Sequence, residues 1–472
     1  MGTDAMSILP FAVLALGGAA VFGLGAFWRT RPGGLLWGLA LVFVAWAGLA
    51  ELWVPSGAGG LSGMIEPTGH GRYFGLILCA IAAVSMLFLQ QYASRRGFGG
   101  DELYGCILLA TLGMILVAAA ANWAVFFLGF ELLSVSLYIL IAMNRGEAGA
   151  GEAGLKYFIT GAVAGGFLVF GLALLYGATG TLDIGPGWAG LSPTEPPLAL
   201  LAFGFILAGL AFKLSIVPFH LWTPDVYQGA PAPVTAFLST GSKVAVLALL
   251  TRVLLNAPAS VFTALAPALW LLSAATMIVG NVAALRSTSL KRRLAFSSAA
   301  QMGYLLMALL SVQEEGPAAI LFYLPVYAVM DLGAFGLLGS FSVKGSDRDE
   351  LSDYRGLGFA HPWRSGVMAL CLVSLAGLPP TAGFVGKFLI LKSVLAGGHF
   401  LLASIGILTM MISIYYYAEV VVFLYMHPEK EASAVTPPRV WDRLAWAAVF
   451  VLILGLGVAP SSLIAYISRM TW

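Results

Sequence analysis

Apolar stretches long enough to cross a lipid bilayer recur along the whole chain, and no other feature of the sequence limits its fold as strongly. A transmembrane helix needs about 20 mostly apolar residues, because each helical residue adds about 1.5 Å and the hydrocarbon core is about 30 Å thick. By this rule the sequence predicts an all-α polytopic membrane protein of about fourteen helices. Their approximate spans are residues 8–28, 35–53, 73–93, 103–120, 122–143, 152–177, 198–226, 231–255, 263–285, 289–312, 317–343, 365–393, 400–426 and 440–467.

The composition supports a membrane protein and argues against several other classes. Of the 472 residues, 60% are hydrophobic and 10% are charged, whereas a soluble domain has about 45–50% apolar and about 25% charged residues. A formal net charge of +2 gives no indication of nucleic acid or of an acidic substrate as a partner. The first apolar stretch is followed, not preceded, by Arg29 and Arg31, so we expect a helix rather than a cleaved signal peptide.

The basic residues of the predicted loops are divided unevenly between the two sides of the membrane. If the amino terminus faces outside, sixteen of the 24 Lys and Arg residues lie in cytoplasmic loops: Arg29, Arg31, Arg95, Arg96, Arg145, Arg286, Lys291, Arg292, Arg293, Lys344, Arg348, Arg355, Arg364, Lys430, Arg439 and Arg443. The opposite side has Arg72, Arg252, Lys392 and Arg469. This imbalance follows the positive-inside rule, so we expect both termini on the outer side and an even number of helices.

The other four basic residues are lysines inside predicted helices: Lys156, Lys213, Lys243 and Lys387. An ionisable side chain at the centre of a membrane helix costs about 2.5–3.5 kcal/mol on insertion scales, so it is kept only where something offsets that cost. Lys156 lies near the start of its helix, and its side chain could equally extend to the interface. Lys213 and Lys387 lie next to helix breaks at depth, which favours a functional role.

Acidic residues accompany these lysines. Glu131 is central in its predicted helix, Asp331 is similarly placed in "YAVMDLGAFGLL", and Glu419 lies nearer a helix end. A lone buried carboxyl takes up a proton and a lone buried lysine loses one, whereas neighbouring opposite charges keep each other ionised. Because the proton affinity of each group then depends on the charge of its neighbour, such a set is typical of a proton relay.

Two predicted helices are broken by proline close to a lysine. "LAGLAFKLSIVPFHLW" breaks at Pro218, and "SLAGLPPTAGFVGKFLILK" breaks at Pro379 and Pro380. Proline removes a backbone donor and frees carbonyls that need water or side-chain partners. Broken helices with glycine and proline at depth indicate the ion path of a transporter. His220 follows the first break; no second metal ligand is near it in sequence, so we expect a proton-relay or hydrogen-bonding role.

The order of the breaks predicts an internal repeat. If helices four to eight and nine to thirteen form two units, the broken helix is the fourth in each. Five helices per unit is an odd number, so consecutive units would be inverted relative to one another, as in many secondary transporters. The predicted parts are residues 1–102 (helices one to three), 103–262 (first repeat), 263–427 (second repeat) and 428–472 (helix fourteen).

Motifs for cofactors and metals are missing from the sequence. Cys79, Cys106 and Cys371 lie far apart in apolar runs without metal-ligand spacing, so we expect them to be core residues. No Walker A loop, dinucleotide fingerprint, HExxH motif or nucleophile elbow is present. Gly161 and Gly165 form a GxxxG pattern that indicates close helix packing. The sequence therefore predicts no metal and no cofactor in this chain.

Four strings resemble a known family: "WTPDVYQGAPAPVTAFLSTGSK", "GLPPTAGFVGKFLILK", "ATLGMILVAAAANWAVFFLGFELLSVSLYIL" and "GLKYFITGAVAGGFLVFGLALLYGATG". They are similar to the subunit N family of the proton-pumping NADH-quinone oxidoreductase, respiratory complex I, over residues 70–430. The resemblance implies an antiporter-like membrane subunit of that enzyme. It also implies that NADH, FMN, iron-sulfur clusters and quinone are handled by other subunits, and that the partners are lipids and neighbouring membrane-arm subunits.

The resemblance assigns roles to the buried charges. It implies that Glu131 is the fifth-helix glutamate and that Lys213, Lys243 and Lys387 are the seventh-, eighth- and twelfth-helix lysines of a proton-conducting axis. Lys156 and His220 match further polar positions of that axis. Asp331 departs from the family pattern, which has an uncharged residue there. It is either a packed, protonated acid or a partner for one of the lysines.

Two other functions are considered. A subunit of a multisubunit sodium/proton antiporter shares the fold and the lysines, but "WTPDVYQGAP" favours subunit N. A non-conducting structural membrane subunit has no use for costly buried charges such as Glu131, Lys213 and Lys387. We expect a multi-pass protein of the bacterial inner membrane that couples quinone reduction to proton transfer.

Overall fold

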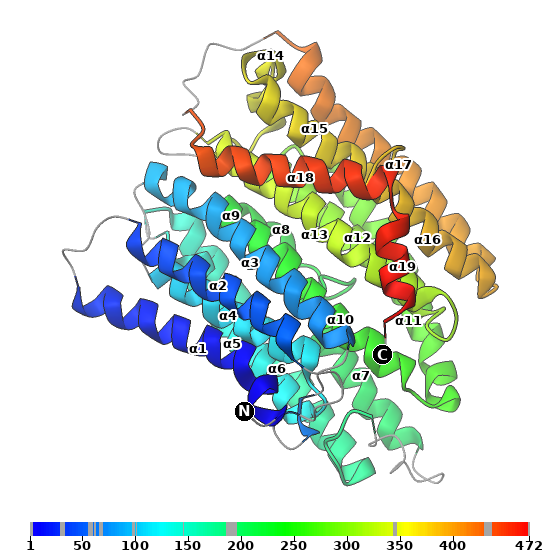
Figure 1. Ribbon diagram of the computed structural model, residues 1–472. Coiled ribbons are helices and arrows are strands. Elements are labelled where there is room, and N and C mark those ends of the chain that lie inside the picture. Colours follow the sequence, from blue (N-terminus) through cyan, green and yellow to red (C-terminus); the bar gives the residue numbers. More distant parts are fainter. Residues whose placement is uncertain are drawn as a thin grey trace.

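The computed structural model describes residues 3–28, 34–54, 60, 63–65, 69–96, 100, 102–144, 146–185, 196–342, 347–428 and 437–470. In these ranges the chain is almost wholly helical, and its few β-bridges are isolated ones. The long helices run side by side in one bundle, as Figure 1 shows. This confirms the predicted all-α fold.

The helices are α1 (Thr3–Phe27), α2 (Leu35–Trp53), α3 (Gly69–Arg96), α4 (Glu102–Ala119), α5 (Trp123–Ala142), α6 (Ala148–Thr179), α7 (Pro196–Lys213), α8 (Trp222–Gly229), α9 (Ala232–Phe237), α10 (Lys243–Leu255), α11 (Ala259–Arg286), α12 (Leu290–Leu309), α13 (Gly316–Ser340), α14 (Leu357–Ala360), α15 (Pro362–Ala376), α16 (Ala382–Ala396), α17 (Phe400–Met426), α18 (Val440–Val458) and α19 (Ser461–Ser468). A π-helical turn, η3 (Leu238–Ser242), joins α9 to α10, and a 3-10 turn, η4 (Leu351–Tyr354), precedes α14.

Each of the fourteen predicted segments is helical, but three are interrupted. Two interruptions were predicted, and they separate α7 from α8 and α15 from α16. The third, between α18 and α19, was not. Ala459 leaves the helical conformation there because Pro460 follows it, and the residue before a proline disfavours the α conformation. In the described ranges, eleven helices are long and apolar enough to cross a membrane, so the count of fourteen crossings stays a prediction.

Small residues set the spacing between neighbouring helices. A Cβ atom on Gly113 of α4 would lie 2.6 Å from the carbonyl oxygen of Gly129 on α5, so only glycine lets these backbones approach so closely. Between α5 and α6, a Cβ on Gly161 would collide with the Tyr138 hydroxyl, and one on Gly165 would lie 3.0 Å from Glu131 Oε1. The predicted role of the GxxxG pattern in helix packing is confirmed.

The centre of the bundle is formed by α9, η3, α10, α12 and α13. Their side chains are almost all buried, including serines, two lysines and a carboxylate. Helices at the periphery, such as α1, α11 and α17, instead expose large apolar side chains, which suit contact with lipid or with other subunits. α18, the second helix from the carboxyl terminus, lies against α13, α15 and α16 (Figure 1). Costly polar groups are thus concentrated where lipid does not reach.

Candidate functional site

The first helix break begins at a buried lysine. α7 ends at Lys213, and the chain then follows an irregular path through Pro218 to α8. Ser215 has φ +60°, a conformation that is uncommon for residues other than glycine. Polar groups stabilise the break: Val217 N donates to Thr276 Oγ1 at 3.1 Å, and Trp222 Nε1 donates to the carbonyl of Phe212 at 3.0 Å. The predicted break is therefore confirmed, although the α-helix already ends five residues before Pro218.

Lys213 is 1% exposed and lies among groups that stabilise an ammonium. Its Nζ donates to Ser134 Oγ at 2.8 Å and lies 5.0–6.0 Å from the ring centroids of Phe130, Tyr138 and Tyr157. Such ring faces attract a cation.

Glu131 does not form an ion pair with Lys213 in the structure. It lies three residues before Ser134 on α5, which places the two side chains on one face of the helix. Glu131 is only half-buried in this chain. It lies beside Gly165 of α6, at the edge of the bundle.

Lys243 is completely buried at the start of α10, directly after the π-helical turn η3. Its Nζ donates to Ser298 Oγ of α12 at 2.5 Å and lies 5.7 Å from the Tyr227 ring centroid. The sequence predicted a regular helix here. A π turn inserts one extra residue into the helix, and such turns occur frequently at functional sites.

Lys387 uses the carbonyls that the second break leaves free. It is 3% exposed, and its Nζ donates to Leu375 O at 2.6 Å and to Ala376 O at 3.3 Å, at the end of α15. Gly377 closes that helix with φ +84°, and the Thr381 hydroxyl donates to the Leu378 carbonyl across the Pro379 and Pro380 turn. A cation at a helix carboxyl terminus is stabilised by the helix dipole. At this break the lysine is therefore in direct contact with the end of the interrupted helix.

The polar face of α12 lies between Lys243 and Lys387. Ser298 contacts Lys243, and Gln301 Nε2 donates to the same Leu375 carbonyl that accepts from Lys387, at 3.2 Å. The Tyr304 ring lies 5.1 Å from Lys387 Nζ. Sequence reasoning missed these residues, although "SSAAQMGY" repeats polar side chains every three to four positions, which places them on one helix face.

Lys156 and His220 lie apart from the three buried lysines. The Lys156 side chain is 44% exposed and pairs with Glu152 at 2.7 Å and Asp225 at 3.0 Å. Unlike the other three lysines, Lys156 is thus exposed and held in direct ion pairs. His220 is buried in the first break, and its Nδ1 has no hydrogen-bond partner within the described ranges.

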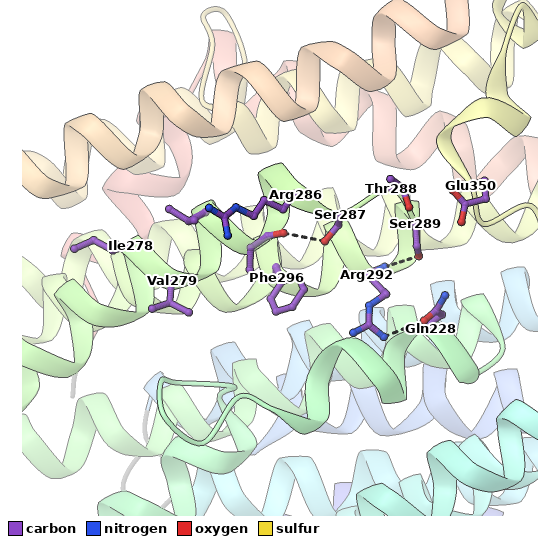
Figure 2. A pocket seen from close by; sticks show the side chains of 12 residues that line it. Gln228, Ile278, Val279, Arg286, Ser287, Thr288, Ser289, Arg292, Phe296 and Glu350 are labelled. Carbon is purple, nitrogen blue, oxygen red and sulfur yellow. Dashed lines mark hydrogen bonds between the residues drawn. The ribbon is translucent and has the colours of Figure 1, made fainter.

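Charged and polar side chains connect α8, the helix after the first break, to α12. Arg292 of α12 donates to Asp225 of α8 at 2.7 Å and to Gln228 at 3.1 Å. Figure 2 shows Arg292 and Gln228 on the wall of a groove of about 660 Å³ between α8, α11 and α12. Lys291 pairs with Asp347 at 2.6 Å.

Of the sixteen predicted loop bases, Arg29, Arg31, Arg145, Lys344 and Lys430 lie outside the described residues.

The residues that could bind a metal are dispersed. Where the structure describes the chain, no group of three or more His, Cys, Asp or Glu side chains could hold a metal ion. Cys79, Cys106 and Cys371 are buried free thiols, as predicted for core residues.

Comparisons with known proteins identify the family of the chain. Residues 120–413 match the family model described as NADH:quinone oxidoreductase/Mrp antiporter, TM. The chain is 42% identical to NADH-quinone oxidoreductase subunit N 1 of Solidesulfovibrio magneticus, covering 100% of this chain and 99% of that one. It is 43% identical to NADH-quinone oxidoreductase subunit N of Geotalea uraniireducens, covering 99% of both.

Solved structures share the fold. A chain of respiratory complex I from Thermus thermophilus superposes with a TM-score of 0.84 at 34% identity, covering 97% of this chain and 98% of that chain. A chain of the Mrp complex from Dietzia sp. superposes with a TM-score of 0.78 at 19% identity, covering 99% and 96%. The second likeness shows the fold alone.

Proposed function

The chain belongs to the subunit N family, the antiporter-like membrane-arm subunits of NADH-quinone oxidoreductase that take part in proton translocation, and we propose that protons move in it along Glu131, Lys213, Lys243 and Lys387. One observation carries the proposal: three lysines are almost completely buried in the bundle, and each has a different set of neutral partners. A buried ammonium without a carboxylate in direct contact is held only weakly in its charged form. Each lysine can therefore release its proton when the charge of its neighbours changes.

The hydrogen-bond partners of the lysines differ in whether they can take part in a proton transfer. The Ser134 hydroxyl accepts from Lys213 and donates to the carbonyl of Phe130, and its helix presents Glu131 on the same face. At the other end of the axis, carbonyls alone contact Lys387 directly. Because carbonyls only accept, they stabilise the charged lysine without taking its proton.

Glu131 and the two helix breaks complete the proposed path. The partly exposed Glu131 lies at the edge of the chain, where a neighbouring membrane-arm subunit can deliver or receive a proton. Pro218, Pro379 and Pro380 keep the backbone open beside Lys213 and Lys387. Lys156 and His220 act as auxiliary groups at the first break, Lys156 through its ion pair with Asp225.

The same proposal covers cofactors, internal repeats and orientation in the membrane. The chain acts as a translocase subunit without a redox centre, and NADH, FMN, iron-sulfur clusters and quinone are bound by other subunits. Two inverted five-helix units, residues 103–262 and 263–427, form the conducting part. Both termini face outward from the bacterial inner membrane, with residues 1–102 and 428–472 outside the two units.

The alternatives have less support. A sodium/proton antiporter subunit shares the fold, as the likeness to the Mrp chain indicates, but the relatives at 42–43% identity over the full length are named subunit N. A structural subunit without conduction gains nothing from buried lysines, which would be more stable as apolar residues.

Replacing Lys213 tests the proposal. Lys213→Arg keeps the charge but practically never releases a proton, so it should impair pumping nearly as much as Lys213→Met. We expect NADH-driven proton uptake by vesicles to fall about tenfold or more at matched complex content, since a positioned acid–base group contributes about 100-fold or more to a proton transfer.

Lys392 provides the matched control, because it is exposed and pairs with Glu315 at the surface. Lys392→Arg and Lys392→Met should pump normally. Wild-type uptake in Lys213→Arg would mean that the lysine only supports the fold, and the proposed path would be wrong.

A further inference from the structure

Asp331 is a completely buried carboxylate in the middle of α13. Its Oδ2 accepts a hydrogen bond from the Tyr327 hydroxyl at 3.3 Å, one helical turn away. Its Oδ1 is buried and has no hydrogen-bond partner among the described residues. The Ser239 side chain also interacts with this carboxyl. A carboxyl that is completely buried costs free energy unless it is well paired, so packing alone does not explain its presence.

A row of hydroxyl groups joins this carboxyl to a lysine. Lys243 Nζ donates to Ser298 Oγ at 2.5 Å, and Ser298 Oγ lies 2.7 Å from the Tyr327 hydroxyl, which in turn contacts Asp331. The four groups come from α10, α12 and α13 and are all buried. No other residue is needed to connect the two ionisable ends.

The protons of this row can be arranged in two complete ways. A hydroxyl has one proton to donate and can also accept. If Lys243 is an ammonium and Asp331 a carboxylate, every bond points from the lysine toward the acid. If Lys243 is a neutral amine and Asp331 a neutral acid, every bond points the other way. The row therefore has a complete set of hydrogen bonds in both the charged and the neutral state.

We propose that Asp331 exchanges a proton with Lys243 through Ser298 and Tyr327, which deepens the proposed function and rests on it. In the transfer, an N–H bond of Lys243 breaks and an O–H bond forms on Ser298. Ser298 passes its own proton to Tyr327, and Tyr327 passes its proton to Asp331. One proton has moved, the total charge is unchanged, and the reverse sequence restores the charged pair.

Tyr327 is also able to interrupt this row. Its hydroxyl lies 2.9 Å from the carbonyl oxygen of Ser239, in the π-helical turn, as well as 3.3 Å from Asp331 Oδ2. A hydroxyl has only one proton, so donating to Ser239 breaks the connection to the acid. The rotation of one hydroxyl thus decides whether Lys243 and Asp331 communicate.

The experiment compares three substitutions in the assembled enzyme complex, reconstituted into vesicles. Asp331→Asn removes the ionisable end, Tyr327→Phe removes only the hydroxyl in the middle, and Asp331→Glu keeps a carboxyl. We expect the first two to lower NADH-driven proton uptake about tenfold or more, by the contribution of a positioned acid–base group, and Asp331→Glu to recover part of it.

An infrared difference spectrum gives a readout that a merely structural role would not change. During NADH turnover, a carboxyl C=O band should appear as Asp331 is protonated. The band should be lost in Asp331→Asn and its change with turnover suppressed in Tyr327→Phe. A band that is unchanged in Asp331→Asn would overturn the assignment.

Two controls match the test residues in burial and chemistry. Glu51 is a buried carboxyl on α2, and Tyr73 is a buried tyrosine on α3 whose hydroxyl donates to the Leu321 carbonyl of α13. Glu51→Gln and Tyr73→Phe should pump like the wild type. Loss of uptake in these controls as large as in the test variants would mean that any buried polar change disrupts the bundle, which overturns the inference.

The outcome separates this inference from the proposed function. If Asp331→Asn and Tyr327→Phe pump normally while Lys213→Met does not, the exchange with Asp331 is wrong and the lysine path stands. If Lys213→Met also pumps normally, the proposed function is wrong. Should Asp331→Asn fail to assemble, Tyr327→Phe decides alone, because it leaves both charged ends and the ring in place.

Discussion

Neutral partners, rather than direct ion pairs, hold the buried lysines. Lys213 contacts a serine hydroxyl, Lys243 another, and Lys387 two backbone carbonyls. A direct carboxylate contact would stabilise the ammonium strongly and so hinder release of its proton. A hydrogen bond to a hydroxyl holds the lysine in place but stabilises its ammonium less than an ion pair does, so the proton is released more easily.

Ser134 tests this idea at a single hydroxyl. A hydrogen bond to a charged group contributes about 1.5–3 kcal/mol, so Ser134→Ala should shift the protonation equilibrium of Lys213 about tenfold to a hundredfold. We expect a clear fall in NADH-driven proton uptake by vesicles, with normal assembly.

Ser136 is the control, two residues away on the same helix. Both serine hydroxyls donate to the carbonyl four residues back, but only Ser134 contacts Lys213. Equal pumping by Ser134→Ala and Ser136→Ala would show that the contact with the lysine has no functional effect.

At the scale of helices, the breaks leave backbone carbonyls free to bind site residues. The end of α15 presents carbonyls to Lys387, and the irregular segment that contains Pro218 and His220 begins directly after Lys213. An unbroken helix would use these carbonyls in its own hydrogen bonds. The proline and glycine residues therefore act through the backbone rather than through their side chains.

Gly377 tests this role of the second break. Its φ of +84° disfavours any residue with a Cβ atom, and that atom would lie 2.8 Å from Lys387 Cδ. Gly377→Ala should thus add backbone strain of about 1–2 kcal/mol and also displace the lysine. We expect reduced proton uptake in complexes that still assemble.

Gly398→Ala separates the two effects. Gly398 has a similar φ of +77°, but nothing lies within 4 Å of the Cβ that would be added. It should show the strain as a small loss of thermal stability while pumping normally. A pumping loss of the same size in both variants would mean that backbone strain, and not the position of Lys387, is responsible.

In the whole molecule, charges at one end of the bundle join parts that are distant in sequence. Asp347 binds Lys291 of α12 at 2.6 Å and the Tyr92 hydroxyl of α3 at 2.8 Å, and lies 3.8 Å from Arg96. Burial by itself would raise the pKa of the Asp347 carboxyl, but Lys291, Tyr92 and Arg96 more than offset it and hold the pKa below its ordinary value. The cluster therefore fastens α12 to α3 beside the groove at α8.

Removing this carboxylate should destabilise the bundle. Asp347→Asn leaves Lys291 buried without its anionic partner, a change that costs about 3–5 kcal/mol. Because the pKa of Asp347 is lowered on folding, its stabilisation is complete above the unfolded pKa of about 3.9 and is lost as the pH falls through the folded value. We expect a clearly lower thermal unfolding temperature at neutral pH.

The difference from the wild type should shrink in acid, where the wild-type carboxylate is protonated too. Glu315→Gln is the control, since Glu315 forms an exposed pair with Lys392, which contributes about 0–1 kcal/mol. Equal unfolding temperatures for Asp347→Asn and the wild type at neutral pH would contradict the proposed role of the cluster.

Much of this protein could be predicted from its sequence because the bilayer imposes strong rules on short segments. Length and apolar composition located the helices, and proline located the breaks beside Lys213 and Lys387. The free-energy cost of an ionisable side chain inside a membrane helix indicated that Lys243 and Asp331 need an explanation. Each of these inferences depends on residues that are close together in the chain. The GxxxG pattern of Gly161 and Gly165 was interpretable for the same reason.

Only the tertiary structure decided which groups meet. Ser134, Ser298, Gln301 and Tyr327 are ordinary helix residues until packing of distant helices brings them to a buried charge. Packing also placed Lys156 at the edge and left Glu131 partly exposed, because burial depends on how helices surround one another and not on position within a helix. For that reason the sequence could not identify the partner of Asp331. The packing of α10, α12 and α13 places Ser298 and Tyr327 between Asp331 and Lys243.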